Sequence, residues 1–79
     1  MQESNFDRIT VNPMQMGGVP CVRGLRIPVA TVLRMVVNGM GEGAILADMP
    51  GLVLEDIREC LRFAAESALE REMALRRRA

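Results

Sequence analysis

The stretch that most constrains the fold covers residues 16–29, which hold three glycines, two prolines and two arginines in fourteen positions. Glycine adopts positive φ at little steric cost, and proline fixes φ near about −65°. This composition is typical of turns rather than of a continuous helix or strand. The stretch therefore predicts that the chain reverses here, with Gly17, Gly18 and Gly24 at the turning positions.

Short strands are expected before and within this stretch. Residues 8–11 alternate polar with β-branched apolar side chains, as in a half-buried strand, and Asn12-Pro13 ends the alternation. The return strand is expected from about residue 19 or 21 to Arg23. Together these segments predict a short N-terminal β-hairpin.

Three helices are expected after the hairpin. Pro28 suits the first turn of a helix over about 28–38, and Gly39 fits the position after its end, where positive φ is needed. A short helix over about 42–48 and a long one from 54 to about 76 follow. The sequence thus predicts a mainly α fold, with a short N-terminal β-hairpin followed by a three-helix helix-turn-helix bundle and a long C-terminal helix.

Apolar residues recur at steps of three and four in these helices, as expected for buried stripes. The stripe of the first helix is Val29, Val32, Leu33, Val36 and Met40. The short helix is expected to turn inward Ile45, Leu46 and Met49. The stripe of the third helix is Leu54, Ile57, Leu61, Ala64, Ala65, Ala68, Leu69 and Met73. We expect this helix to close the core through Leu54, Ile57, Leu61 and Ala64 or Ala65.

The length of the chain indicates one domain over residues 1–79. Its expected parts are an N-terminal arm and hairpin (1–27), a helix-turn-helix core (28–66) and a C-terminal helical extension (67–79). A chain of 79 residues buries only about 60% of its unfolded surface. Its 49% hydrophobic content is aliphatic rather than aromatic. The chain has more aliphatic surface than so small a domain can bury, which predicts that it pairs with a second copy as a homodimer.

The residue types that are absent argue against catalysis. The chain has no His, Lys, Tyr or Trp, so imidazole bases, Schiff-base lysines and most aromatic stacking platforms are missing. We expect no enzymatic activity, no cofactor and no metal. Cys21 and Cys60 match no CxxC motif and are expected as reduced core residues, with a redox role as the alternative. No segment approaches the ~18 apolar residues of a membrane span, so a cytoplasmic protein is expected.

The charge balance bears on nucleic-acid binding. Ten arginines face ten acidic residues, whereas a dedicated DNA-binding protein usually has a basic excess. This argues against strong DNA binding by an isolated monomer, although arginines gathered on one face of a dimer would still form a positive patch.

Four arginines are the candidate DNA-binding residues: Arg23, Arg26, Arg58 and Arg62. For the two near the hairpin tip, the structural alternative is that they bridge the hairpin to acidic residues such as Asp48, Glu55 or Asp56. For the two on the third helix, the alternative is a solvated ion-pair face with Glu55, Glu59 and Glu66. Both alternatives stay open at this point.

The C-terminal run offers a candidate partner-binding surface. Its members are Leu69, Met73, Leu75 and Arg76. One interpretation is a solubilising helix end. Another is an arm whose apolar residues dock on a partner protein, and the same stripe is also suited to pairing with a second copy.

Several of these motifs together resemble one small prokaryotic family, the domain of unknown function four-three-three (DUF433). The resemblance covers about residues 7–66 and is carried by residues 8–13, the stretch 16–29, Gly39-Met40, and residues 45–50 and 54–58. It implies a homeodomain-like helix-turn-helix preceded by a strand pair. It also implies a VapB-type antitoxin that neutralises a PIN-like ribonuclease toxin and binds its own operator DNA. The rival function is a protein-association module that binds no DNA.

The sequence departs from the family pattern at two places. Gly41-Glu42-Gly43-Ala44 stands where relatives often have a Ser-Pro-Glu-Glu type of helix start, and an interior glycine costs roughly 1 kcal/mol relative to alanine. Val53 replaces the usual capping hydroxyl of the third helix, which costs on the order of 1 kcal/mol unless the backbone finds another acceptor. The second helix is therefore expected to be the weakest element.

Overall fold

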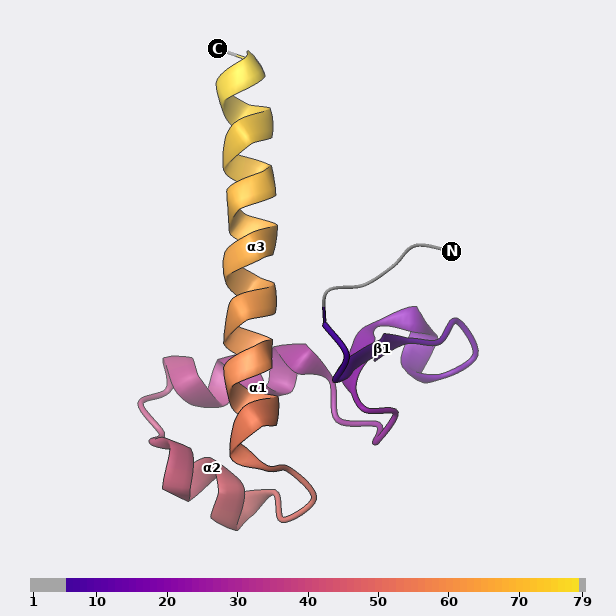
Figure 1. The fold of residues 1–79 in the computed structure, drawn as a ribbon, viewed down its shortest axis with the longest axis vertical. Coiled ribbons are helices and arrows are strands. Elements are labelled where there is room, and N and C mark those ends of the chain that lie inside the picture. Colours follow the sequence, from indigo (N-terminus) through magenta and orange to yellow (C-terminus); the bar gives the residue numbers. More distant parts are fainter. Residues whose placement is uncertain (1–5, 79) are drawn as a thin grey trace.

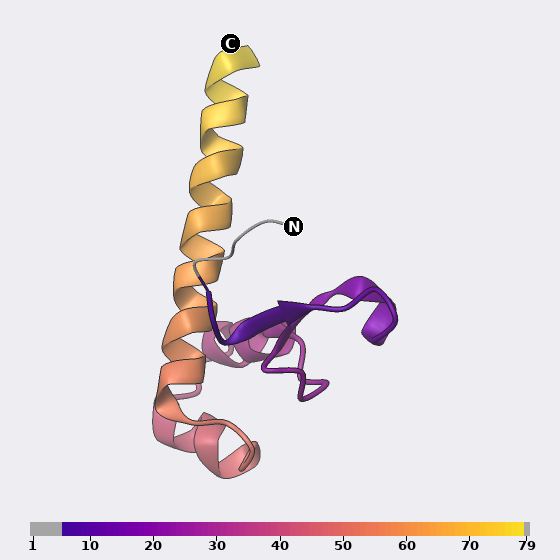
Figure 2. The ribbon, with the colours of Figure 1, turned by 45° about the vertical axis from the view of Figure 1, so that its right-hand side comes forward.

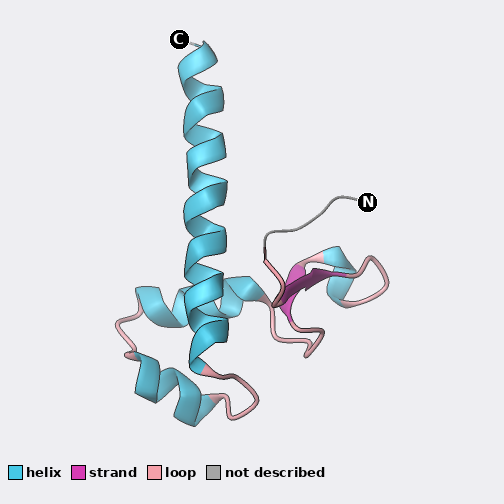
Figure 3. Ribbon diagram, in the orientation of Figure 1, coloured by secondary structure: helices cyan, strands magenta, loops and turns pink. Residues whose placement is uncertain are grey.

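The computed structural model describes residues 6–78, and it describes the side chains of all of these except residues 16 and 72–78. A β-hairpin is followed by three helices (Figures 1 and 3). The elements in chain order are β1 (Ile9–Val11), the 3₁₀ turn η1 (Met16–Gly18), β2 (Pro20–Val22), α1 (Val29–Val37), α2 (Glu42–Asp48) and α3 (Leu54–Arg78). The predicted fold class is confirmed, and α3 ends two residues later than expected.

The hairpin pairs β1 with β2 in antiparallel register, with Ile9 opposite Val22. The connection between the strands contains η1, where Gly17 and Gly18 adopt φ of 69° and 85°. A β-carbon is strained at such angles, so the double glycine permits the turn. The turning role predicted for these glycines is confirmed.

A second tight turn follows β2 at once. Arg23 and Gly24 both have positive φ, 47° and 70°, and the N–H of Leu25 donates to the carbonyl of Val22 at 2.8 Å. Two positive φ values in succession are typical of a type I′ turn, whose twist matches that of the flanking strands. The turn at Gly24 was expected, whereas the positive φ of Arg23 was not. A left-handed conformation costs a residue with a β-carbon roughly 1 kcal/mol, so other contacts of Arg23 must hold it there.

Pro28 and Gly39 lie at the two ends of helix α1. The helix begins at Val29, one residue later than predicted, so Pro28, with φ of −65°, immediately precedes its first turn. Gly39 has φ of 88° just beyond the end. Its N–H donates to the carbonyl of Val36, and that of Met40 donates to Met35, which is the Schellman pattern.

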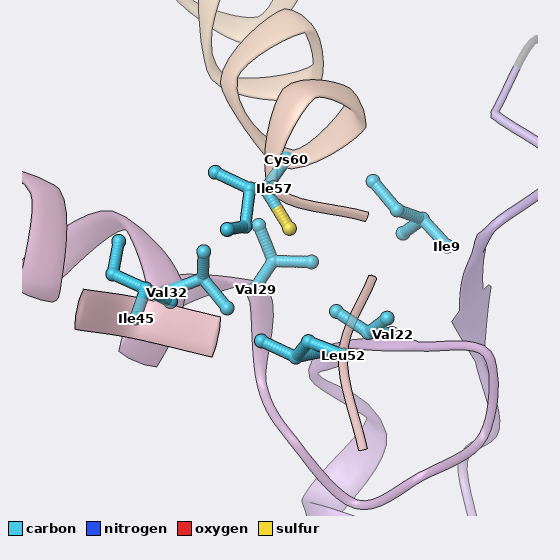
Figure 4. Packing of buried hydrophobic residues seen from close by; sticks show 8 residues of the cluster. All are labelled: Ile9, Val22, Val29, Val32, Ile45, Leu52, Ile57 and Cys60. Atoms are coloured by element: carbon cyan, nitrogen blue, oxygen red, sulfur yellow. The ribbon is translucent and has the colours of Figure 1, made fainter. Parts of the chain in front are cut away.

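The core lies where α3 crosses α1, with the hairpin against one end (Figures 1 and 4). The side chains that point toward one another come from every helix, both strands and the loop before α3. They are Ile9, Val22, Val29, Val32, Ile45, Leu52, Ile57 and Cys60. Leu46 and Met49 pack against this cluster, so the expected inward face of α2 is confirmed.

The expected core face of α3 is partly wrong. Ile57 is buried as predicted and Ala64, rather than Ala65, is half-buried, but Leu61 is 39% exposed. Cys60 and the half-buried Phe63 occupy the inner face instead. Each residue turns the helix by about 100°, so a long run of apolar residues at steps of three and four spans two faces. Only one of these faces can point at α1.

The distal half of α3 extends away from the body of the protein (Figures 1 and 2). Its 25 residues make a rod of about 37 Å. Every described side chain from residue 65 to residue 71 is exposed. The helix therefore has a proximal half that closes the core and a distal half that projects from it.

Candidate functional site

Asp56 is the centre of the polar cluster of the protein. It lies in the first turn of α3, its side chain is 0% exposed, and its carboxylate accepts four hydrogen bonds. Two come from Arg23, one from Arg8 and one from the backbone N–H of Val53. A buried carboxylate is stable only when its charge and lone pairs are matched in this way.

Arg23 forms the strongest of these contacts. Its Nε lies 3.0 Å from Oδ1 and its Nη2 lies 2.8 Å from Oδ2 of Asp56, so the guanidinium forms a bidentate pair with the carboxylate. Nη2 also donates to the carbonyl of Gly51 at 2.8 Å. These bonds join the hairpin turn to the α2–α3 loop and to α3. They account for the left-handed backbone of Arg23, because the turn aims its side chain at α3.

Arg8 and Glu59 extend the cluster along α3. Nη1 of Arg8 lies 3.2 Å from Asp56, and the backbone N–H of Arg8 donates to Glu59 at 2.7 Å. Arg62 bonds the other oxygen of Glu59 at 3.0 Å, and its guanidinium lies 5.7 Å from the centre of the Phe6 ring. The chain entering β1 is thus fastened to two successive turns of α3.

The charges in this cluster shift one another's pKa. Burial raises the pKa of Asp56, but hydrogen bonds from Arg23, Val53 and Arg8 outweigh it and hold the pKa below its usual 3.8. The bond to Asp56 in turn raises the pKa of Arg23. The pair is therefore charged throughout the physiological pH range and acts as a structural clamp rather than as an acid–base pair.

The Asp56 carboxylate also bonds the residue that precedes α3. The N–H of Val53 donates to Oδ2 at 2.8 Å, and Asp56 lies three residues later. This is one half of a capping box, in which an acidic side chain reaches back to the residue before the helix. In the other half of a capping box, a hydroxyl at position 53 would accept the N–H of Asp56. Here the backbone carbonyl of Val53 accepts this N–H instead, at 2.9 Å.

The two cysteines lie in the core as expected for structural thiols. Cys21 and Cys60 are free and buried. Burial, together with the charges of Asp56 and Glu59, raises the pKa of Cys60 to about 11. A thiol of this pKa is almost wholly protonated at neutral pH and is a poor nucleophile or metal ligand. The described residues contain no group of His, Cys, Asp and Glu side chains placed to hold a metal ion.

The predicted arginines fall into different environments. Arg23 is committed to Asp56, one of the three carboxylates weighed as its structural partner. Arg26 is exposed with φ of 66°. Arg58 pairs with Glu42 of α2 at 3.7 Å, a partner that spacing along α3 does not predict. Arg62 bonds Glu59, as the ion-pair alternative expects.

The predicted partner-binding residues lie on the projecting half of α3. Leu69 is 54% exposed. The backbone of α3 continues past Met73, Leu75 and Arg76, whose side chains lie outside the described residues.

Sequence reasoning missed Arg8 and its backbone bond to Glu59, and it named Asp56 only among several acids. The signal for Asp56 was its place three residues after Val53 in the first turn of a helix, where a carboxylate accepts a backbone N–H. No local pattern marks Arg8, because its partners lie 48 and 51 residues away.

Comparison with known proteins identifies the family. The profile of the family described as "Protein of unknown function (DUF433)" matches residues 9–64, more than half of the chain. The chain belongs to the DUF433 family. A crystal structure of a DUF433 member from Anabaena variabilis is similar to it, with 30% identity and a TM-score of 0.71 over 85% of this chain and 68% of that one. No curated protein matched the chain.

The DUF433 region coincides with the body of the protein. It contains Arg23, Asp56 and Glu59 and ends at residue 64, immediately before the run of exposed side chains on α3. Within residues 6–78, no helix is both long enough and apolar enough to cross a membrane. The family match thus describes the clamped body, and the projecting half of α3 lies beyond it.

Proposed function

We propose that the protein is a non-enzymatic, antitoxin-like component of a cytoplasmic type II toxin–antitoxin pair, which binds a PIN-like ribonuclease toxin and masks it. The observation that carries this proposal is the distal half of α3. It leaves the body after residue 64, and Leu69 is 54% exposed upon it. A lone helix of roughly four turns is only marginally stable in water. A partner protein would bury its apolar side and order it.

The mode of binding follows from the form of this segment. An amphipathic helix that docks in a groove presents a few apolar anchors, which supply most of the affinity, and charged residues at their edges. The C-terminal run supplies Leu69, Met73 and Leu75 as anchors, with Arg76 as a flanking charge. The body of the protein would then act as a rigid base for the helix.

The chemistry of the described residues supports binding rather than catalysis. The buried carboxylate is held charged by two arginines, and the Cys60 thiol has a pKa of about 11. Neither group is placed to accept or donate a proton at neutral pH.

The test is an RNA-cleavage assay with a purified PIN-like ribonuclease, with and without the protein. We expect the full chain to inhibit cleavage and a chain truncated after Arg71 to lose inhibition while its circular dichroism and thermal midpoint stay close to those of the full chain. A full chain that binds no such ribonuclease, or a truncated chain that inhibits equally well, would contradict the proposal.

Operator binding is a second part of this proposal, and one observation favours the rival module that binds no DNA. Arg23, Arg58 and Arg62 each have a carboxylate partner within 4 Å, which leaves Arg26 as the candidate without a described ion pair. A gel-shift titration with upstream DNA, with and without the ribonuclease, separates the two. Binding that weakens in Arg26→Ala and falls with salt would support operator recognition. No shift at physiological salt would favour the association module.

A further inference from the structure

We infer that the outward side of α3, from Arg58 to Glu70, is a self-complementary surface on which a second copy of this chain docks in antiparallel orientation. This inference rests on the described part of α3 alone, and its tests use the protein without a ribonuclease. It assigns the homodimer expected from composition to a particular surface and geometry.

The first observation is an apolar row outside the core. Leu61, Ala65 and Leu69 follow one another at steps of four and are all exposed, the two leucines by 39% and 54%. The row reads the same from either end, with a small residue between two large ones. In a two-fold pair of helices that crosses at Ala65, each Leu61 meets the Leu69 of the copy, and the alanines let the backbones approach closely.

The second observation is a charged row beside the apolar one, displaced by about 60° around the helix. Arg58, Arg62, Glu66 and Glu70 also follow at steps of four and read plus, plus, minus, minus. Reversal of direction exchanges the two halves of the row. An antiparallel copy therefore places its Glu70 near Arg58 and its Glu66 near Arg62, and two-fold symmetry repeats both pairs. In a parallel two-fold pair the two charged rows would lie on opposite edges of the contact and would not meet.

The charged row is poorly suited to an isolated helix. Like charges four residues apart destabilise a helix by about 0.2–0.5 kcal/mol per pair. The row contains two such pairs, Arg58 with Arg62 and Glu66 with Glu70, against one pair of opposite charges, Arg62 with Glu66. Among the described residues, neither glutamate forms an ion pair. Both arginine side chains remain 61% exposed despite their bonds to Glu42 and Glu59, so they can bond outward as well. A second copy would relieve the repulsion.

The centres of the two rows agree. The apolar row is centred on Ala65 and the charged row between Arg62 and Glu66, one residue away. Rows at steps of four are the ridges that interlock when two helices pack at about 50° to one another. The crossing carries the two bodies away from each other, because each core lies on the opposite side of its own α3.

A charge-swap experiment tests this assignment by sedimentation velocity at tens of micromolar. Glu66→Arg with Glu70→Arg gives an all-positive row, and Arg58→Glu with Arg62→Glu gives an all-negative one. We expect wild type to be a dimer and each double variant to be monomeric, with a dissociation constant raised by about a hundredfold or more. An equimolar mixture of the two variants should regain the mass of a dimer. Circular dichroism and thermal melting check that each variant is folded.

The fourfold variant that reverses the row to minus, minus, plus, plus is the matched control. It remains self-complementary only in the antiparallel orientation, so it should dimerise like wild type. Oxidation adds a second readout: Ala65→Cys should give a covalent dimer, whereas Ser67→Cys, which faces another side of α3, should not. A monomeric wild type, double variants that stay dimeric, a mixture that stays monomeric or equal cross-linking at both positions would overturn the inference.

Discussion

The inner and outer sides of α3 use charge in opposite ways. On the inner side, the carboxylates of Asp56 and Glu59 are buried, and each is met by an arginine and a backbone N–H. On the outer side, Arg58, Arg62, Glu66 and Glu70 are exposed and follow in the order plus, plus, minus, minus, and Arg62 also bonds Glu59 on the inner side. Satisfied charges fasten the hairpin to the helix, whereas the outer charges are arranged for a second molecule. One helix thus closes the fold and offers a surface for association.

The inner side should be the more sensitive to substitution. Asp56→Ala removes four hydrogen bonds and leaves two arginines without their shared carboxylate, so we expect a loss of about 3 kcal/mol or more in the free energy of unfolding. Urea denaturation followed by circular dichroism measures it. Asp56→Asn keeps the shape and an acceptor for Val53 and should lose less. Equal stability of wild type and Asp56→Ala would show that the cluster does not hold the hairpin.

Acid should act on the inner side through the same group. Because the pKa of folded Asp56 lies below its unfolded value near 3.8, the unfolded chain binds a proton more readily, and stability falls as pH falls. The contribution of Asp56 is fully present above about pH 5 and is lost as pH drops through the folded pKa. Urea unfolding at pH 7 and pH 3 should show a larger loss for wild type than for Asp56→Asn. An identical acid loss in the two proteins would contradict this cause.

A stabilising change in α2 separates folding from association. Gly43 is the second residue of α2, with open space where a β-carbon would stand, so Gly43→Ala should raise the free energy of unfolding by about 0.5 kcal/mol. The dissociation constant of the dimer should stay the same, because α2 presents neither row. A changed dissociation constant would mean that the body takes part in the interface.

The parts of the fold that the sequence predicts are those marked by local chemistry. Gly17, Gly18, Gly24 and Gly39 adopt the positive φ expected of them, and α2 has the expected bounds. These features depend on residues close together in the chain, where steric rules decide. The alternation of residues 8–11 was likewise enough to locate β1.

The sequence could not predict which side of α3 is buried, because the hydropathy of a helix does not show which elements it packs against. Leu61 looks like a core residue and is half exposed, while Cys60 takes its place beside α1. The burial of Asp56 depends on Arg23, which lies 33 residues earlier in the chain. Whether the Asp56 carboxylate is buried or exposed therefore depends on the position of the hairpin that carries Arg23.

The independence of the outer side from folding can be measured with Leu69→Glu in dilute protein, where the chain is monomeric. Leu69 is 54% exposed, so the free energy of unfolding should stay within about 0.5 kcal/mol of that of wild type. Ser67→Glu on another side of the same turn is the matched control and should behave alike. A loss of 2 kcal/mol or more for Leu69→Glu alone would place this residue in the core and contradict a helix that closes the fold with one side and binds a partner with the other.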